Sequence, residues 1–354
     1  MINYVKYLCN NYPQLVEDMK NSKHSYKGSY NKYHMEDSVW SHTSMVSKLG
    51  ELILEPEYEN VKIACLLHDI GKPESREEDH EKGKTTFYGH AGVSFWKSID
   101  ILNKMLPEIS SESPSIRRED KIEILSLIAL HLSFMDIKDN PTKIRHKFKN
   151  NQDLLWKLAK LYYCDSNGRF SYEEDYATRK EILDIGNINV IEDTPDSKYK
   201  SITLFCGLPC SGKSTLINKI KTHNTTVISR DNLLLLEANT DDYQKAWETV
   251  DHNKINTLLE ESFIRAVHKR KDIIIDMTNM SKKARNKFTS RVPGEYTKKC
   301  VIMATGLEEI KRRNYIRSNE NKKHIPNEVL LNMQKSFSLP MYDEFDIIDF
   351  VFDK

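Results

Sequence analysis

The sequence has few of the features that mark secreted or membrane proteins. Its six cysteines are scattered along 354 residues and form no CxxC pair, which indicates reduced thiols in an intracellular protein. The amino-terminal stretch MINYVKYLCNNYPQLVEDMK has no apolar segment of the kind found in signal peptides, and no later apolar run approaches membrane-spanning length. We therefore expect a cytoplasmic protein that does not contact a membrane.

The chain also lacks an excess of either charge. Lys and Arg together number 53, and Asp and Glu together number 52. A phosphate-rich partner would therefore have to be bound by a local basic patch, because the overall field attracts neither sign. Charged residues make up 30% of the chain and hydrophobic residues 39%, as in globular proteins, and the length is enough for two domains with separate cores.

The sequence contains no internal repeat and no low-complexity tract, but its pattern changes once. Up to about Ile185 it predicts helices without strand alternation, and the stretch GNINVIEDTPDSKYK then has the composition of a linker. From Ser201 onward, short β-rich runs alternate with helical segments: SITLFC, TTVIS, DIIIDMT, KKCVIMA and FDIIDFV. The pattern predicts an all-α domain over residues 1–187, a linker over 188–200, and an α/β domain with a mainly parallel sheet over 201–354.

A phosphate-binding motif follows the first of these runs. The segment GLPCSGKS matches G-x-x-x-x-G-K-[ST], from Gly207 through Gly212 and Lys213 to Ser214, between a predicted strand and a predicted helix. In such a loop backbone N–H groups surround the β-phosphate, the lysine meets the β- and γ-phosphates, and the serine ligates Mg²⁺. With the adjoining Thr215, these residues predict a site for ATP, or another NTP, with Mg²⁺.

Several later residues suit phosphoryl transfer. Asp231 follows a predicted strand, so it is either the base that takes a proton from an attacking hydroxyl or the N-cap of the next helix. Asp276, Thr278 and Asn279 end another strand and could line the same crevice. The basic run KRRNYIRSNENKK, which contains Arg317, is either a solvated helix face or a lid over the transferred phosphoryl group.

These segments together resemble the kinase domain of phage polynucleotide 5′-kinase. The order GLPCSGKST, SRD, DMTN, RRNYIR and HIPNEVLLNMQKSF covers nearly all of residues 200–345. The resemblance implies that Lys213 and Ser214 hold ATP and Mg²⁺, that Asp231 is the general base for a 5′-hydroxyl, and that Arg317 contacts the phosphates. Leu234 stands where that kinase has an arginine for the acceptor's 3′-phosphate, so the preference for the acceptor's 3′ end stays open.

In the first half of the chain, four predicted helices each have a stripe of apolar residues at helical spacing, and each stripe includes one polar residue. These polar residues are His42, His68, His131 and Asp165. Unpaired, each buried polar group would cost about 1–3 kcal/mol, and a shared divalent metal removes that cost. Asp69 directly follows His68, and His90 offers a further imidazole that could hold a second ion together with His131.

This pattern resembles the HD phosphohydrolase superfamily. The segments VWSHTSMV, LLHDIGKP, GHAGV and CDSNGR carry the similarity over about residues 34–170, and the HD domain attached to tRNA nucleotidyltransferases is the nearest type. The resemblance implies that the metal ligands are His42, His68, Asp69 and Asp165. It gives outer or second-metal roles to His90 and His131.

Two cations and a rival ligand complete the predicted metal centre. Lys72 and Arg169 resemble the phosphate-contacting residues of the superfamily, and the alternative is surface charge at helix ends. His34 is a second choice for the first metal ligand, because it precedes the predicted helix and lacks the apolar stripe.

A phosphate-removing domain joined to a phosphate-adding domain resembles the bacterial HD-polynucleotide kinases. The resemblance implies an enzyme that phosphorylates 5′-OH ends and removes a 3′-phosphate or 2′,3′-cyclic phosphate, preparing RNA or DNA ends for a ligase. The alternatives are a nucleotide phosphohydrolase fused to a nucleoside or metabolite kinase, and a non-catalytic nucleotide-sensing regulator. The sequence leaves open RNA against DNA, the NTP donor, the oligomeric state, and the metal among Mn, Ni, Co, Fe, Cu and Zn.

Overall fold

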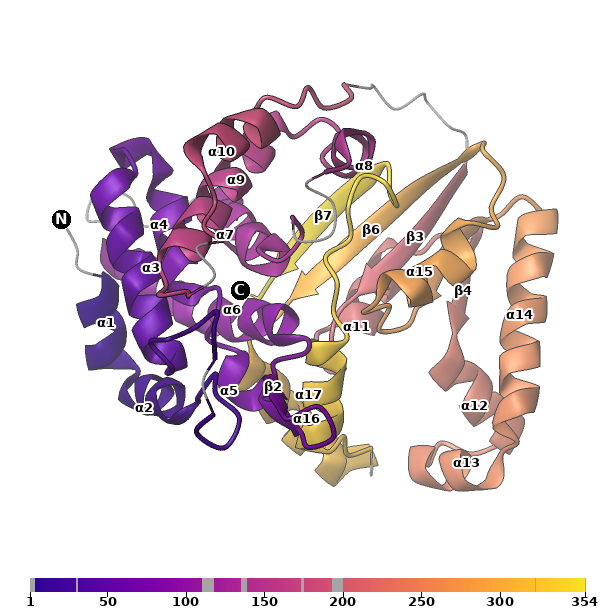
Figure 1. Cartoon of the computed structure of the whole chain (residues 1–354). Helices are drawn as coiled ribbons and strands as arrows, with labels where there is room; N and C mark the ends of the chain where they lie inside the picture. Colours follow the sequence, from indigo (N-terminus) through magenta and orange to yellow (C-terminus); the bar gives the residue numbers. More distant parts are fainter. Residues whose placement is uncertain are drawn as a thin grey trace. The chain divides into compact units, whose positions relative to one another are not determined.

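The structure of the chain is a computed structural model. The residues that it describes are 4–29, 31–109, 118–134, 139–172, 175–192, 200–321 and 323–353. It divides into two compact units, Met1–Asp193 and Thr194–Lys354, and each is considered by itself (Figure 1). The division falls inside the expected linker. Residues 193–199 of that linker, and Lys322 of the expected lid, lie outside the described residues.

The first unit is built mainly of helices, as predicted. Its helices are α1 (Tyr4–Asn11), α2 (Pro13–Asn21), α3 (Val39–Ile53), η1 (Pro56–Tyr58), α4 (Glu59–Leu67), α5 (Lys72–Ser75), α6 (His90–Ile109), α7 (Arg118–Leu130), α8 (Pro141–Lys147), α9 (Gln152–Asn167) and α10 (Arg179–Gly186).

Helix α4 forms the centre of this unit. Helices α1, α3, α7 and α9 all contact it, and every residue from Val61 to Leu67 is buried. The sequence predicted a single inward stripe that leads to His68, but a helix with neighbours on several sides buries its whole circumference. His68 and Asp69 therefore end α4 inside the unit, where α3, α7 and α9 can bring further side chains to them.

The helical first unit also contains one small hairpin that the sequence did not predict. Residues Glu77–Asp79 (β1) pair antiparallel with Lys84–Thr86 (β2) in a small hairpin. Charged and polar residues fill both strands, so the sequence shows no apolar alternation there. The turn contains Gly83 at a φ of +59°, which glycine adopts without strain. The Thr85 hydroxyl ties the hairpin to the unit by donating to the carbonyl of Ser25 at 2.9 Å.

The second unit contains a five-stranded sheet in the order β4-β5-β3-β6-β7, in which every neighbouring pair is parallel. The strands are β3 (Lys200–Cys206), β4 (Thr225–Ser229), β5 (Asp272–Asp276), β6 (Tyr296–Ala304) and β7 (Ile347–Phe352). These are the five runs that the sequence predicted, with ends that differ by a few residues. The predicted fold class, a helical domain followed by an α/β domain with a parallel sheet, is confirmed.

Helices connect these strands, as parallel pairing requires. They are α11 (Lys213–Ile220), α12 (Arg230–Ala238), α13 (Tyr243–Thr249), α14 (His252–His268), α15 (Lys282–Thr289), α16 (Leu307–Asn321) and α17 (Asn327–Lys335). Figure 1 shows α12, α13, α16 and α17 beyond the arrowheads of the strands, so the carboxyl edge of the sheet carries the loops and helices that can form a site. None of the described helices is both long and apolar enough to cross a bilayer.

Candidate metal centre and phosphate-binding cavity

Asp69 is the centre of a cluster of buried side chains in the first unit. Its Oδ2 lies 3.5 Å from Nε2 of His42, on α3, and 3.3 Å from Nε2 of His68, at the end of α4. Oδ1 of Asp165, on α9, lies 2.9 Å and 3.4 Å from the same two nitrogens. Three helices thus bring two imidazoles and two carboxylates to one point.

The other carboxylate oxygen of Asp69 faces a second pair of imidazoles. Its Oδ1 lies 3.2 Å from Nε2 of His90, at the start of α6, and 3.8 Å from Nε2 of His131, which follows α7. The two imidazole nitrogens are 3.0 Å apart. Asp69 therefore joins two groups of potential metal ligands, one at each of its oxygens.

Backbone carbonyls fix the imidazole rings of His68, His90 and His131. In each residue Nδ1 lies against the carbonyl oxygen three residues earlier in the chain, at 2.9, 2.7 and 2.7 Å. A carbonyl oxygen only accepts hydrogen bonds, so each Nδ1 carries the proton and the neutral ring keeps its lone pair on Nε2. This is the tautomer in which Nε2 can bind a metal.

The facing nitrogens of His90 and His131 indicate a cation between them. Two lone pairs at 3.0 Å repel each other unless a proton or a metal ion separates them. Burial lowers the pKa of His131 to about 3, so a proton is disfavoured there near neutral pH. A divalent ion would satisfy both nitrogens and Oδ1 of Asp69 together.

The charges around Asp69 show the same need for a cation. Burial would lower the pKa of His68, but the charges of Asp69 and Asp165 outweigh burial and raise it to about 10. Nε2 of His68 and both carboxylate oxygens of Asp69 are buried without a hydrogen-bond partner among the described residues. The donor set therefore fits one or two divalent transition ions, because imidazole and carboxylate are their usual ligands.

The segment after Asp69 approaches α6 very closely. A Cβ added at Gly71 would lie 2.5 Å from the backbone nitrogen of Ser94 and 2.6 Å from the carbonyl oxygen of His90. The Gly71 amide instead donates to Oγ of Ser94 at 2.9 Å. Only glycine permits this approach, which brings the start of α6, and with it His90, to Asp69.

The two predicted phosphate-binding cations differ in their surroundings. Lys72 is buried, and its Nζ lies 2.6 Å from Oδ2 of Asp69, where it neutralises the carboxylate. Arg169 follows α9 and pairs through Nη2 with Asp175 at 2.8 Å, while its buried Nε has no hydrogen-bond partner among the described residues. Lys72 is therefore part of the cluster itself, and Arg169 belongs to the loop beside it.

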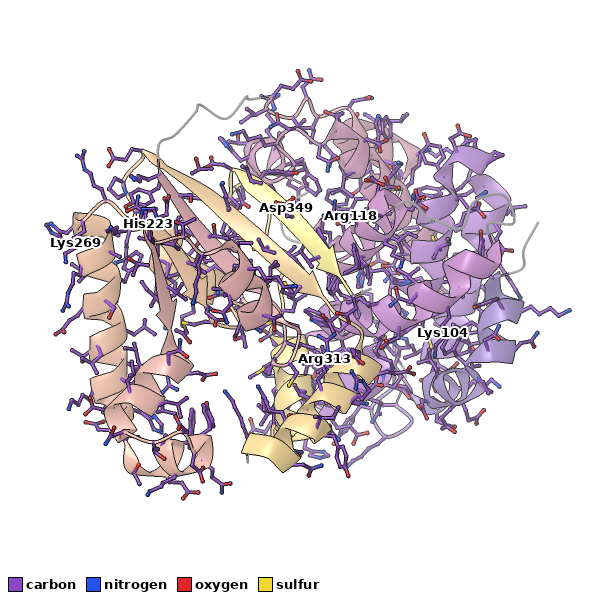
Figure 2. All side chains as sticks on the ribbon, turned by 180° about the vertical axis from the view of Figure 1, so that it is seen from behind. Lys104, Arg118, His223, Lys269, Arg313 and Asp349 are labelled. Carbon is purple, nitrogen blue, oxygen red and sulfur yellow. The ribbon has the colours of Figure 1, made fainter. Side chains whose placement is uncertain are left out.

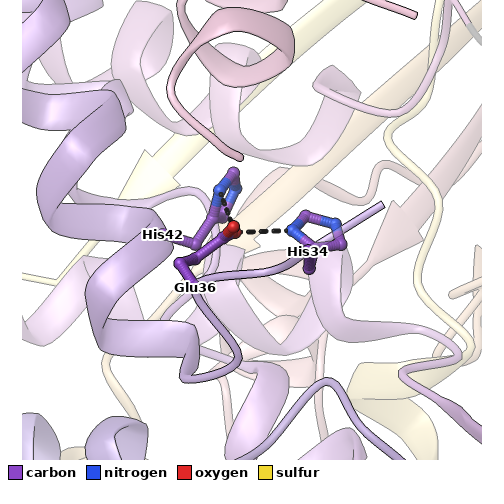
Figure 3. Close-up of side chains that lie close together, drawn as sticks. All are labelled: His34, Glu36 and His42. Carbon is purple, nitrogen blue, oxygen red and sulfur yellow. Dashed lines mark hydrogen bonds and ion pairs between the residues drawn. The ribbon is translucent and has the colours of Figure 1, made fainter. Parts of the chain in front are cut away.

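Glu36 is a buried neighbour of the cluster that the sequence did not indicate (Figure 3). Its Oε1 lies 2.8 Å from Nδ1 of His34 and 3.4 Å from Nδ1 of His42. Glu36 thus orients His42 from the side opposite Asp69, and the rival ligand His34 reaches His42 through this carboxylate. Helical spacing gave no signal for Glu36, since it lies in the loop before α3.

In the second unit, the phosphate-binding motif forms the turn between β3 and α11. Gly212 has a φ of +88°, which side chains rarely adopt, and Lys213 begins the helix. Nζ of Lys213 donates to the carbonyl oxygens of Gly207 at 2.9 Å and Leu208 at 2.7 Å. Burial lowers the pKa of Lys213 to about 8. The lysine is thus held inside the loop in which phosphates would bind.

The end of β5 supplies a carboxylate to this loop. Oγ of Ser214 donates to Oδ2 of Asp276 at 3.0 Å, and burial together with the charge of Asp231 raises the pKa of Asp276. Thr278 lines the same cavity. Asn279 is buried, and its side-chain amide donates to a carbonyl oxygen of β3 at 2.9 Å, so it links the end of β5 to β3. The sequence suggested that Asn279 lines the crevice, but it is not among the residues that line the cavity.

Asp231 lies in the first turn of α12 but does not cap it. The N-cap is Ser229, whose side chain accepts from a backbone amide of that turn, so the capping alternative for Asp231 is wrong. The Asp231 carboxylate accepts a hydrogen bond from the hydroxyl of Tyr243 at 3.1 Å and pairs with Nζ of Lys323. Its side chain therefore lines the cavity, with a phenol and an ammonium at its two oxygens.

The basic helix α16 divides into a solvated face and a cavity face. Arg312 is exposed and pairs with Glu309, as surface charges do. Arg313, labelled in Figure 2, donates to the carbonyl oxygen of Cys210 in the phosphate-binding loop at 3.2 Å. Nε and Nη2 of Arg317 are buried without a hydrogen-bond partner among the described residues. A guanidinium with unused donors in a cavity is suited to an anionic ligand.

A single cavity of about 1340 Å³ contains these groups. Most of the nucleotide-binding and catalytic residues predicted for this unit line it: Gly212, Lys213, Ser214, Thr215, Asp231 and Arg317. Gly207 instead lies against Met303, where an added Cβ would be 2.9 Å from Cβ of that residue.

Comparison with known proteins identifies both halves of the chain. Residues 39–184 match a family model described as an HD domain, and residues 202–340 match one described as an AAA domain. The chain therefore carries an HD domain followed by an AAA, or P-loop, domain.

Two of the solved structures that resemble the chain come from Pnkp1/Rnl/Hen1 complexes. One belongs to the Pnkp1/Rnl/Hen1 RNA repair complex, with 21% identity, 40% of this chain and 45% of that chain covered, and a TM-score of 0.34. The other belongs to a Pnkp1/Rnl/Hen1 complex, with 20% identity, 34% and 41% covered, and a TM-score of 0.28. The chain thus matches less than half the length of either protein.

Proposed function

We propose that the chain is a bifunctional enzyme that repairs the ends of broken nucleic acids. Its P-loop unit is an ATP-dependent 5′-OH polynucleotide kinase, and its HD unit is a metal-dependent phosphatase for 3′-phosphate or 2′,3′-cyclic phosphate ends. The observation that carries the kinase assignment is one cavity that contains the P-loop, an acidic residue suited to be a base and an unpaired arginine. This combination suits phosphoryl transfer, with the acidic residue as acceptor of the proton of an attacking hydroxyl.

In the kinase reaction, each residue has a defined task. Lys213 and Ser214, with Thr215, bind the phosphates and Mg²⁺, and Asp276 orients Ser214 through their 3.0 Å hydrogen bond. Asp231 accepts the proton of the attacking 5′-hydroxyl. The oxygen of that hydroxyl bonds to the γ-phosphorus of ATP as the bond to ADP breaks and ADP leaves. Arg317 donates to the phosphoryl oxygens as they pass between donor and acceptor.

In the HD unit, the proposed ligands divide between the two oxygens of Asp69. His42, His68, Asp69 and Asp165 would hold one ion, and His90 and His131, together with Asp69, would hold a second. A divalent ion bound there would polarise a phosphoryl oxygen and lower the pKa of its water.

The two proposed cations of the HD unit assist by binding phosphate. Nζ of Lys72 lies 2.6 Å from Oδ2 of Asp69, and we propose that this ammonium contacts the non-bridging oxygens of the substrate's phosphate beside the metal ligands. Arg169, with an unused Nε, is proposed to contact the same phosphate.

The two activities act on the two ends left by one kind of break. A strand with a 5′-OH on one side and a 3′-phosphate or 2′,3′-cyclic phosphate on the other cannot be ligated. The proposed kinase installs the 5′-phosphate and the proposed phosphatase exposes the 3′-OH, so the product is a substrate for a ligase. RNA, DNA or both can meet this description.

The test is incubation of the purified chain with ATP and an oligonucleotide that carries a 5′-OH and a 3′-phosphate, across several divalent metals, with both ends analysed. Lys213→Ala should abolish transfer of the γ-phosphate and leave 3′-phosphate release intact. Asp69→Ala should do the reverse. Release of the 3′-phosphate by Asp69→Ala would overturn the HD assignment, and a preference for mononucleosides over oligonucleotides would favour a small-molecule kinase instead.

A further inference from the structure

Helix α13 presents two aromatic rings to the kinase cavity. Tyr243 and Trp247 are four residues apart and therefore lie on one face of the helix. Their ring centroids are 6.1 Å apart with an interplanar angle of 27°, and both residues line the cavity. Between them, Ala246 is buried and packs with Leu234 of α12 and Ile255 of α14. Tyr243 packs against the same cluster, so α13 and this ring are anchored in a core, while Trp247 lies outside it and lines the cavity.

Trp247 is exposed to an extent that packing does not explain. It keeps 45% of its surface exposed, although it is the largest side chain of α13. The Arg230 guanidinium lies 5.1 Å from its ring centroid, and the His252 ring lies 4.5 Å away. These neighbours hold the indole in place and leave part of it open, as in sites where an aromatic ligand stacks.

Tyr243 connects this aromatic pair to the proposed chemistry. Its hydroxyl donates to Oδ1 of Asp231 at 3.1 Å, and burial with the charge of Asp231 raises the pKa of this tyrosine, so it stays protonated. A hydroxyl bound at Asp231 would therefore lie near the Tyr243 side chain. Nζ of Lys323 lies 3.6 Å from the centroid of the Tyr243 ring, so the part of the aromatic pair that is open to a ligand is the exposed Trp247 ring, one helical turn further.

The size of the cavity leaves room for such a group. Ligand pockets usually measure about 300–1,000 Å³, so a cavity of about 1340 Å³ can hold a nucleotide donor and part of a second ligand. The P-loop residues and Arg317 account for the donor phosphates. The aromatic pair and Arg230 remain for the acceptor.

We infer that Tyr243 and Trp247 form a stacking platform for the nucleobases at the 5′ end of the acceptor strand. The inference rests on the proposed kinase function and narrows its acceptor to one that carries bases, as opposed to a sugar or another metabolite. Stacking uses the π-face that every base has, so the platform is tolerant of sequence. Arg230, which lies over the Trp247 ring, supplies a cation for the strand's phosphates.

The test compares two 5′-OH acceptors of equal length, one with bases throughout and one with abasic residues at its first two positions. In the wild-type enzyme the abasic acceptor should have a KM higher by about tenfold or more, given typical base–aromatic stacking. Trp247→Ala should raise the KM of the normal acceptor to that of the abasic one, with the KM for ATP unchanged. Trp247→Phe should restore most of the difference in KM between the normal and the abasic acceptor. Tyr315→Ala, at a residue of α16 that is 69% exposed, is the matched control.

The outcomes separate this inference from the function beneath it. Equal KM values for the two acceptors in the wild-type enzyme would overturn the platform and leave the kinase assignment standing. A Trp247→Ala enzyme that loses kcat equally with both acceptors would also overturn it, because the residue would then act through the packing of α13. If neither oligonucleotide is phosphorylated while a nucleoside or metabolite is, the kinase assignment itself fails, and the platform fails with it.

Discussion

Replacing Gly71 by alanine should open the HD cluster on one side only. The added Cβ must move from 2.5 Å to the 3.4 Å of an ordinary contact with the Ser94 backbone, a shift of about 0.9 Å. Both neighbours on α6 are backbone atoms, which cannot rotate away as a side chain can. The segment that contains Asp69 and the start of α6 would therefore have to move apart. Nε2 of His90, now 3.2 Å from Oδ1 of Asp69, would then lie about 4 Å away.

The expected result is the loss of one metal ion and not of both. His42, His68 and Asp165 come from α3, α4 and α9, which Gly71 does not separate, so their ion should stay bound. The variant should bind one equivalent of Mn²⁺, compared with the two proposed for the wild-type protein, as measured by elemental analysis after gel filtration. Overpacking of this kind costs about 1–3 kcal/mol, which for a unit of this size lowers Tm by about 2–12 °C.

A matched control is available in the same chain. A Cβ added at Gly294, in the P-loop unit, meets nothing within 4 Å, so Gly294→Ala should keep both ions and the wild-type Tm. The reasoning is refuted if Gly71→Ala binds two ions with unchanged phosphatase activity. It is also refuted if both ions are lost while the unit stays folded, because the two groups of ligands would then not be separable at Asp69.

Three further predictions concern the P-loop unit. Burial lowers the pKa of Lys213 to about 8, so the lysine is charged below that pH and neutral above it. Because bound phosphates favour the charged form, ATP binding should take up close to one proton at about pH 9 and almost none at about pH 7. Calorimetry in buffers of different ionisation enthalpy measures this uptake, and finding none at the higher pH would contradict the prediction. Leu234→Arg should destabilise the unit by about 3–5 kcal/mol without creating a preference for 3′-phosphate acceptors, since Leu234 is fully buried, and a stable variant with that preference would disprove it. Arg285→Ala, which leaves Glu344 buried without its guanidinium, should lower the free energy of unfolding by about 3–5 kcal/mol, whereas a double change to Arg285→Met and Glu344→Leu should cost less than the single one, as denaturant titration can show.

The sequence predicted most of the fold because the periodicity of each half is strong. The β-rich runs of the second half have few polar interruptions, and each became a strand of the parallel sheet. The hairpin of β1 and β2 could not be predicted, because its residues are charged or polar and its position depends on contacts such as that of Thr85 with Ser25. Such distant backbone contacts leave no local pattern.

The candidate sites show the same division between local and distant causes. Helical spacing was enough to predict that His42, His68 and Asp165 turn inward. It could not show that Asp69 presents one oxygen to each of two groups, because this depends on how closely Gly71 approaches α6. Glu36 was missed because a loop residue has no period.

Roles that depend on a neighbour were equally hidden from the sequence. By position alone Asp231 was either a base or a cap; the Ser229 cap excludes the second alternative, and the base role stays a proposal. Lys72 carries a charge that suits phosphate, and its position three residues after Asp69 also allows the 2.6 Å ion pair with that carboxylate, which the sequence reasoning did not consider.

As the proposed base, Asp231 is engaged at both oxygens before any substrate arrives. The hydroxyl of Tyr243 and the ammonium of Lys323 hold it, and burial lowers the pKa of that lysine. A carboxylate held in this way would be a poor base for a water molecule, so in the proposed reaction ATP bound without an acceptor would stay intact. An acceptor that displaces Lys323 would free the proposed base, and consumption of the phosphate donor would then depend on the arrival of the acceptor hydroxyl.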